Sequence, residues 1–443
     1  MYNSKPSIYE KMTIQSADGS RSADINAGAF MVTYYENLFS PIVTAKINVV
    51  NTGDSIVGKD GKMQSIYNGF PLRGGERVVL KIAGNSEVNK EGLDFSKNPR
   101  DYFYVASITN VLIDSGREIF TLNLVPREAI TNETTRVGKK FPGSQTISDS
   151  VKNIIKDYLK SDKIAKIDKT QNPYGFIGNL KKPFTILTWL SSKGVPASTG
   201  KDASAGYLFY QTKDGFNFRS IDDLIDQKAY KNKFVYTPGV VDDQDPRKNF
   251  KILNYGTNKN QDLIGKLERG AYCSYRLFFN PLTFEYTNPQ KGLFKLADYQ
   301  KEVKNLGKEI VLPPISDDSD ETLGDVPSRY MTAVLDIGTM EKEPFVPKDP
   351  NIAENCDPFR VQSQSIMRYN VIFTQIMEMT IPFNANLRAG MTIECEFPRL
   401  DRQERSEKDT EMSGLYIIKE LCHQFDSEGS FTKLKLIRDT FGN

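Results

Sequence analysis

The chain contains a single histidine, His423, and this limits the catalytic chemistry that its side chains could perform. His423 directly follows Cys422 in the segment GLYIIKELCHQFD, so a Cys-His nucleophile pair is conceivable. Adjacent residues on a strand point to opposite faces of a sheet, however, and such a pair cannot share a proton. A Ser-His pair would also need this one imidazole. We therefore interpret His423 as a structural residue of a strand.

Metal and nucleotide sites lack their usual residue patterns. The four cysteines are far apart and form no CxxC pair, and one histidine cannot complete a zinc ligand set; they are Cys273, Cys356, Cys395 and Cys422. Their spacing is typical of free thiols in a reducing compartment. The phosphate-binding patterns GxGxxG and GxxxxGK are absent. We expect neither a metal nor a cofactor.

Acidic residues offer two further kinds of chemistry. One acidic run could suggest a calcium loop, but it lacks the turn glycine and the terminal glutamate of an EF-hand; it contains Asp317, Asp318, Asp320, Glu321 and Asp325. We interpret this run as a solvated linker. The 56 acidic residues also offer carboxylate pairs for acid-base work on a glycosidic bond, but no spacing singles out one pair. We therefore predict no catalytic residue and a protein that is not an enzyme.

Composition sets the broad class of the protein. A chain of 443 residues has room for two to four domains, and 26 Phe and 21 Tyr against one Trp favour sheet structure. A net charge of +2 argues against sequence-specific binding of nucleic acid. The charged amino terminus does not resemble a signal peptide, so the formal glycosylation acceptor Asn132-Glu133-Thr134 has no meaning here. No stretch approaches the ~18 apolar residues of a membrane span.

The elements that would position any site include a repeated one. LRGGERVVLKI, from Leu72 to Ile82, aligns with LRAGMTIECEF, from Leu387 to Phe397, and Leu, Arg and Gly occupy matching positions. After each glycine, apolar residues alternate with others, as a half-buried strand requires; they are Val78, Leu80 and Ile82 in one copy and Ile393, Cys395 and Phe397 in the other. Both copies predict a turn followed by a strand.

A second matching unit follows each copy at a similar distance. FYVASITNVLIDSGREIFTLNLVPRE begins at Phe103 and parallels LYIIKELCHQFDSEGSFTKLKLIRDT, which begins at Leu415. Each has apolar strands on both sides of a turn rich in Asp, Ser and Gly, as a hairpin requires. Because two units recur in the same order, we infer an internal duplication.

The residues between the repeats are mixed in character. Ser148 or Ser150 could cap a helix near 148–160, whose apolar face would hold Val151, Ile154, Ile155, Tyr158 and Leu159. A second helix is predicted over 183–192, beginning with Pro183 and carrying Trp189 as a core residue. A hairpin near 206–220 would turn at Lys213-Asp214-Gly215.

These elements predict a mostly β protein with an α+β insert. Two related β-domains would occupy residues 1–127 and 361–443. Residues 128–300 would form a middle α+β domain, part of which could belong to the second β-domain. Residues 301–360 are rich in Pro, Asp and Glu, which favours an extended linker or arm.

The closing unit resembles the tube domain of phage baseplate hub proteins, a family that includes the T-even-type hub and the amino-terminal part of type VI VgrG spikes. The resemblance rests on Leu-x-x-Gly and a strand, then GLYIIKELCHQF, a turn and FTKLKLIRD. GYLFYQTKDGFNFRSIDDL and the PREAITNE...RVGKKFPG...ISDSV stretch look like the second domain of the hub. The resemblance covers most of the chain, and its motifs include no catalytic signature.

The resemblance implies two tube-type β-barrel domains and a structural role. Hubs of this family are homotrimers in which two tube domains per chain give a pseudo-sixfold ring around a central channel. Such a ring adapts the hexameric tail tube to the trimeric spike. It implies location in the tail baseplate of a contractile-tailed virion after assembly in the host cytoplasm. It also implies contacts with tail tube or tube-initiator proteins, baseplate wedge proteins and the tape-measure protein.

The second unit finishes at Arg438 and the sequence ends at Asn443, which leaves no room for a spike domain. We therefore expect the spike to be a separate protein, carrying any lysozyme domain. Two other classes of function stay open: a tail-associated cell-wall hydrolase, and a tail protein that binds a glycan or a receptor. Peptidoglycan clearing would distinguish the first, and binding to host cells by the isolated protein the second.

Overall fold

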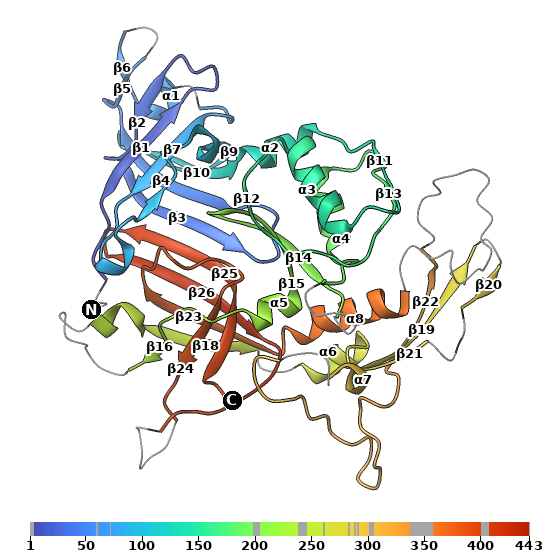
Figure 1. Ribbon diagram of the computed structural model, residues 1–443. Helices are drawn as coiled ribbons and strands as arrows, with labels where there is room; N and C mark the ends of the chain where they lie inside the picture. The colour runs from blue at the N-terminus through green and yellow to red at the C-terminus, as the bar shows by residue number, and fades with distance from the viewer. Residues whose placement is uncertain are drawn as a thin grey trace.

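The computed structural model shows a mostly β protein, as the sequence predicts (Figure 1). Most of its strands join one 15-stranded sheet. Figure 1 shows most of the helices in two inserted regions, away from the blue and red strands of the sheet. The structure describes residues 4–58, 61–70, 72–197, 204–237, 246–259, 262–281, 284–287, 289, 292–300, 305–336, 358–399 and 407–442.

Residues before 127 supply the first half of the large sheet. Its strands are β1 (Tyr9–Gln15), β2 (Ser22–Asp24), β3 (Ala29–Asn37), β4 (Thr44–Thr52), β7 (Arg77–Ile82), β8 (Leu93–Asp94), β9 (Phe103–Asp114) and β10 (Arg117–Pro126). Between β4 and β7 lie a small strand pair and a one-turn helix, namely β5 (Ile56–Val57), β6 (Met63–Gln64) and α1 (Ile66–Gly69). Short 3-10 helices occupy Glu87–Asn89 and Pro99–Asp101.

Residues after 233 supply the second half of the sheet. Its strands are β16 (Phe234–Tyr236), β17 (Lys251–Ile252), β18 (Asn254–Lys259), β23 (Gln375–Pro382), β24 (Thr392–Glu396), β25 (Gly414–Asp426) and β26 (Ser430–Arg438). A 3-10 helix, Pro246–Phe250, precedes β17.

Five strands in each half pair in the same order. In the first β-unit, defined as β3, β4, β7, β9 and β10, the antiparallel neighbours run β3-β4-β10-β9-β7. In the second β-unit, defined as β18, β23, β24, β25 and β26, they run β18-β23-β26-β25-β24. If the five strands of each unit are numbered along the chain, both units therefore place them side by side in the order first, second, fifth, fourth, third. The two stretches that the sequence aligns, Leu72 to Arg127 and Leu387 to Asp439, share one strand order.

One strand pair joins the two β-units into a continuous sheet. Met31–Asn37 of β3 pairs antiparallel with Glu420–Asp426 of β25. Figure 1 shows the blue strand β3 beside the red strands β25 and β26. The resemblance implies two barrels, but among the described strands the pairs make an open sheet and no ring of strands closes.

Alternation along the closing strands builds the main hydrophobic core. Leu122 and Leu124 of β10 are buried, as are Leu434 and Leu436 of β26, and residues of both units contribute to a single cluster. The apolar residues predicted to alternate after Gly75 and after Gly390 are also buried. Burying one Leu or Ile side chain contributes roughly 1.5–3 kcal/mol, so the two units stabilise each other through this shared core.

The middle region follows the first β-unit along the chain. It contains α2 (Arg127–Thr134), β11 (Lys140–Phe141), α3 (Ile147–Asp157), β12 (Ile164–Ile167), β13 (Phe176–Ile177), α4 (Pro183–Ser191), β14 (Tyr207–Thr212), β15 (Gly215–Ser220) and α5 (Ile221–Asp226). The two predicted helices and the hairpin are present as α3, α4 and β14-β15. Trp189, expected in the core, is 42% exposed and packs edge-on against Tyr174 and Phe176.

The predicted cap of α3 is wrong. The N-cap is Thr146, whose hydroxyl accepts a hydrogen bond from the backbone N–H of Asp149. Ser148 and Ser150 lie inside the helix and are buried. The backbone N–H of Ser148 donates instead to the hydroxyl of Thr170, so the tertiary fold decides where the helix begins.

A second insertion separates β18 from β23. It contains α6 (Leu263–Glu268), β19 (Cys273–Asn280), β20 (Glu285–Tyr286), β21 (Leu293–Lys295), α7 (Leu296–Gln300), β22 (Arg329–Val334) and α8 (Pro358–Val371). Of the expected linker, residues 301–360, the structure describes 305–336 and 358–360. In the first of these stretches β22 pairs in parallel with β19, and α8 begins at Pro358. The buried ion pair of Arg368 with Asp222 ties α8 to α5.

The repeated glycine occupies the same backbone position in both units. Gly75 and Gly390 have φ angles of +87° and +85°, which L side chains rarely adopt. The Gly75 N–H donates to the Val105 carbonyl, and the Gly390 N–H donates to the Ile418 carbonyl, each at 2.8 Å. Glycine therefore sets the turn that leads into β7 and into β24.

Replacing these glycines by alanine should destabilise the fold to different extents. Gly75→Ala adds only backbone strain, about 1 kcal/mol, because no atom lies closer than 4.0 Å to the new Cβ. Gly390→Ala should cost more, because its Cβ would lie 2.3 Å from the Tyr210 hydroxyl. Gly53→Ala, which meets nothing within 4 Å, is the control. Urea unfolding measures all three, and equal midpoints for Gly390→Ala and Gly53→Ala would contradict the prediction.

Candidate functional site

His423 lies in a buried, largely apolar environment on β25. It is 1% exposed, and its Nδ1 lies 2.9 Å from the Thr432 hydroxyl. The ring stacks on Tyr34 of β3 and meets the ring of Phe383 edge-on. Burial lowers the pKa of His423 well below 6.5, and the positive charge of Arg388 adds to the effect. The imidazole is therefore neutral and packed between rings.

Cys422 belongs to the other face of the same strand. Its thiol is close to Tyr35, whereas the next side chain contacts Tyr34 and Phe383. Burial raises the pKa of Cys422 to about 11, so no thiolate forms near neutral pH. The prediction that Cys422 and His423 point to opposite faces is confirmed, and they cannot act as a pair.

The remaining candidates for chemistry are dispersed. Cys273, Cys395 and Cys422 are free thiols, and Cys356 lies outside the described residues. Asp317, Asp318, Asp320 and Glu321 are exposed, whereas Asp325 accepts from the backbone N–H and hydroxyl of Thr322. Within the described part of the chain, no three His, Cys, Asp or Glu side chains gather as a metal site would require.

The formal glycosylation acceptor Asn132 is committed to the interior. It lies on α2, is buried, and its Oδ1 accepts a hydrogen bond of 2.8 Å from the backbone N–H of Phe184. Its side chain therefore helps to fix the first turn of α4.

A buried polar site lies at the point where both β-units meet the middle hairpin. Glu36 of β3 is 1% exposed, and one of its carboxylate oxygens accepts from the Tyr34 hydroxyl at 2.8 Å and from the Lys213 N–H at 2.7 Å. The other oxygen accepts from the Ala389 N–H at 2.8 Å. One carboxylate thus binds the first β-unit, the β14-β15 turn and the turn before β24.

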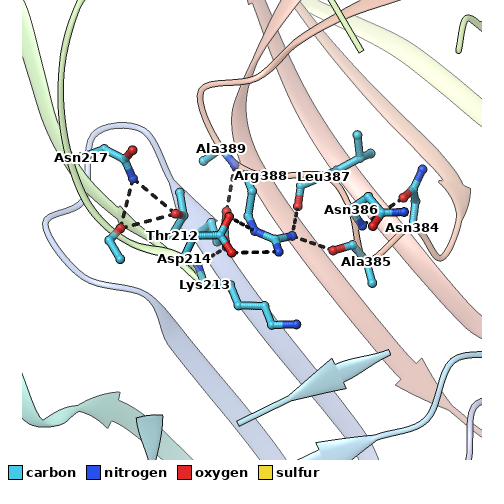
Figure 2. Close-up of polar contacts among 12 residues, drawn as sticks. Thr212, Lys213, Asp214, Asn217, Asn384, Ala385, Asn386, Leu387, Arg388 and Ala389 are labelled. Atoms are coloured by element: carbon cyan, nitrogen blue, oxygen red, sulfur yellow. Dashed lines mark hydrogen bonds and ion pairs between the residues drawn. The ribbon is translucent and has the colours of Figure 1, made fainter. Parts of the chain in front are cut away.

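Arg388 adds a second connection at this place. Its guanidinium donates two bonds to Asp214 in the β14-β15 turn and two to the carbonyls of Ala385 and Leu387 (Figure 2). Burial raises the pKa of Glu36, and the charge of Arg388 opposes that rise. The arrangement is a structural clamp, since every group in it is already bonded within the chain.

The corresponding turn of the first β-unit also bonds to a carboxylate, but to one from a nearby residue of the same unit. In the turn before β7, the N–H groups of Arg73 and Gly74 donate to the carboxylate of Glu76, the residue directly before that strand. Gly74 aligns with Ala389, whose N–H donates to Glu36 from the other β-unit instead. The second turn therefore depends on its neighbour for the carboxylate that the first turn supplies for itself.

Sequence reasoning missed Glu36, although one signal was present. In AFMVTYYEN, Val32, Tyr34 and Glu36 alternate along β3 and face the core. A carboxylate at a core-facing position of a strand indicates buried hydrogen-bond donors nearby. The strand alone cannot identify those donors, because they lie far away in the sequence.

Two strand edges are exposed at the ends of the joined units. Beyond Val105, β9 pairs only with β10 among the described strands. Its tip carries Val111, Leu112 and Ile113, all exposed. In the described residues β18 pairs only with β23, and Asn254 and Gly256 on it are exposed. An exposed strand edge presents backbone N–H and C=O groups that another strand can pair with.

Comparisons with solved structures identify the fold. A 43 kDa tail protein of prophage MuSo2 from Shewanella oneidensis aligns over 97% of this chain and 98% of its own, with a TM-score of 0.51 and 9% identity. A tail protein from Neisseria meningitidis MC58 aligns over 96% of each chain, with a TM-score of 0.51 and 10% identity. The chain has the fold of these tail proteins.

Another solved structure is less similar to this chain, and the sequence itself has no match. A PdpA-VgrG complex from Francisella aligns over 98% of this chain and 53% of that one, with a TM-score of 0.44 and 9% identity. No protein-family model and no curated protein matches the sequence. In the part of the chain that the structure describes, no helix is long and apolar enough to cross a membrane.

The lone histidine gives a test of its neutral, buried state. Because the folded pKa of His423 is lowered, the unfolded chain binds a proton below about pH 6.5 that the folded chain does not. Wild-type stability should therefore fall with pH below 6.5, at up to about 1.4 kcal/mol per pH unit from this residue. In His423→Gln this component should vanish. Urea unfolding from pH 5 to 8 measures it, and identical slopes in both proteins would refute the assignment.

Removing the Glu36 carboxylate should destabilise the junction. Glu36→Ala removes the acceptor of the buried Ala389 N–H and of the partly buried Lys213 N–H, at a cost of about 3 kcal/mol. Glu36→Gln keeps an accepting oxygen and should cost less. Glu87→Ala on the surface should change stability by under about 0.5 kcal/mol. Thermal unfolding ranks the three variants, and a Glu36→Ala midpoint equal to that of Glu87→Ala would reject the clamp.

Proposed function

We propose that this chain is a structural subunit of a phage tail, the baseplate hub of a contractile tail. Three copies form a ring of pseudo-sixfold outline that seats the hexameric tail tube on one face and the trimeric spike on the other. The fold shared with two tail proteins supports a structural role in a tail. The protein acts by geometry and not by catalysis.

The single observation that carries the proposal is the common strand order of the two β-units. Common order, the matching glycine turns and the matching buried residues together support a duplication within the chain. Three chains with two similar units each present six similar modules around a threefold axis. A threefold assembly can then match a sixfold tube without a second kind of subunit.

The division of the chain fits this role. Residues 1–127 and 361–443 form the ring modules, together with part of the middle region, since β18 belongs to the second β-unit. Residues 128–300 form the rest of the middle α+β domain, and β22 within residues 305–336 extends the sheet of that domain by pairing with β19. The modules surround the channel, and the other regions extend outward from it.

The partners follow from the position of such a ring. A separate spike protein, which can carry a lysozyme domain, binds one face. Tail tube or tube-initiator proteins bind the other, baseplate wedge proteins bind the outside, and the tape-measure protein and the genome pass through the channel. The hub assembles in the host cytoplasm and is kept in the virion baseplate.

The mass of the particle in solution tests the proposal. Light scattering should give about three times the 50.1 kDa of one chain, alone or after mixing with the spike protein of the same phage. Negative-stain images of that particle should show a ring with a central hole. A protein that stays monomeric with and without the spike would overturn the proposed function.

A further inference from the structure

The two β-units differ at one pair of equivalent edges. The second half of β25, Glu420–Asp426, is paired on one side with β26 and on the other with β3. The second half of β9 is paired with β10 on one side, and among the described residues no strand occupies the other. One unit thus has a filled edge where the other has an open one.

Residues at the open edge match buried residues at the filled one. Counting back from the aspartates that end the two strands, Asp114 and Asp426, Ile113 matches Phe425 and Val111 matches His423. Phe425 and His423 are each 1% exposed, because β3 and its side chains lie beside them. Ile113 is 69% exposed, and Val111 is also exposed. The first β-unit therefore presents, uncovered, the positions that a neighbouring strand covers in the second.

The strand that would cover this edge is identified by the same correspondence. On β4, one residue faces Leu122 on one side and Val32 of β3 on the other. On β23, one residue faces Leu434 on one side and Tyr255 of β18 on the other. Leu122 and Leu434 are matching residues, so β18 is the counterpart of β3. Its outer edge is open among the described strands, as that of β3 would be without β25.

Among the described strands of one chain, these two edges do not pair with each other. The strands run in the order β18-β23-β26-β25-β3-β4-β10-β9, so β18 and β9 lie at opposite ends of one path. Beside the β-bulge that β9 forms near Asn110, the tip residues Val111, Leu112 and Ile113 include neither a lysine nor a proline that would disfavour pairing. No described strand of the same chain occupies this edge, and the matching strand is β18 of a second copy of this chain.

We propose that the tip of β9 pairs antiparallel with β18 of a second copy, repeating between chains the β3-β25 pairing found within each chain. The register of that pairing, Val32 opposite Phe425 and Tyr34 opposite His423, transfers directly. It places Tyr255 of one copy opposite Ile113 of the next, and Thr257 opposite Val111. This inference rests on the proposed ring, for which it specifies the contact between subunits.

Disulfide trapping tests the register. Thr257→Cys with Val111→Cys places two thiols opposite each other on the same face of paired strands, within the Cα separation that a disulfide needs. Thr257→Cys with Leu112→Cys is the matched control, because neighbouring residues on a strand point to opposite faces. Both pairs are built with Cys356→Ser and Cys422→Ser, since Cys273 and Cys395 are buried. Oxidation should link the first pair between chains, up to trimers, and leave the control unlinked.

A charge at the edge tests the contact without relying on cross-linking. Ile113→Lys should convert trimers to monomers in light scattering, because the interface would bury an unpaired ammonium group. Ile8→Lys, at a residue of similar exposure (72%), should leave the trimer intact. Both residues are exposed in the single chain, so neither substitution should change the thermal midpoint of the isolated protein by much. A lowered midpoint would reveal a variant that misfolds.

The outcomes separate this contact from the proposed ring. A trimer that cross-links only through Thr257 and Val111 and dissociates with Ile113→Lys supports both. A trimer that resists Ile113→Lys and forms no such link overturns the edge pairing and leaves the ring standing. A protein that is monomeric in every arm, including with its spike, overturns the ring and the edge pairing together.

Discussion

The pairing of β3 with β25 is the constraint on which the rest of the molecule depends. It joins strands almost four hundred residues apart in the chain and converts two β-units into one sheet. A slip of one residue would turn Tyr34 and Glu36 away from the core and expose the ring of His423. The hydrogen bonds of Glu36 oppose such a slip, because its carboxylate accepts from two turns outside β3 as well as from Tyr34. Register and inter-unit attachment are therefore fixed by the same residue.

Burying charge at this junction is costly, and the structure offsets the cost with donors. Each Glu36 oxygen accepts at least one hydrogen bond, and the charge of Arg388 lies near enough to oppose the rise of the Glu36 pKa. The same positive charge helps to keep His423 neutral. A neutral imidazole stacked between rings packs as an aromatic residue, which explains how the lone histidine of the chain can occupy the core. The polar groups of Glu36, Arg388 and His423 therefore fix the geometry of the junction, and none of the atoms named here points toward a ligand.

Local pattern and long-range pairing account for what could and could not be predicted from the sequence. The alternation after Gly75 and Gly390, the two hairpins, and the helices α3 and α4 follow from nearby residues, and all are present. The cap at Thr146 and the role of Glu36 depend on contacts with segments distant in the chain, which no local pattern contains. The open sheet in place of two barrels has the same origin. Whether β25 closes on its own unit or on β3 is decided by packing across the whole fold.

The edges of the two β-units suggest why a chain of this design should assemble. Each unit has one edge like that of β3 and one like that of β25, and joining two units in a line uses one of each. One edge of each kind is then left, whatever the number of units in the line. Only a closed ring uses every edge, because the last unit then meets the first. In the proposed ring, the exposed apolar tip of β9 is therefore the expected state of a separate chain, and the angle between the two units within one chain would set how many chains close the ring.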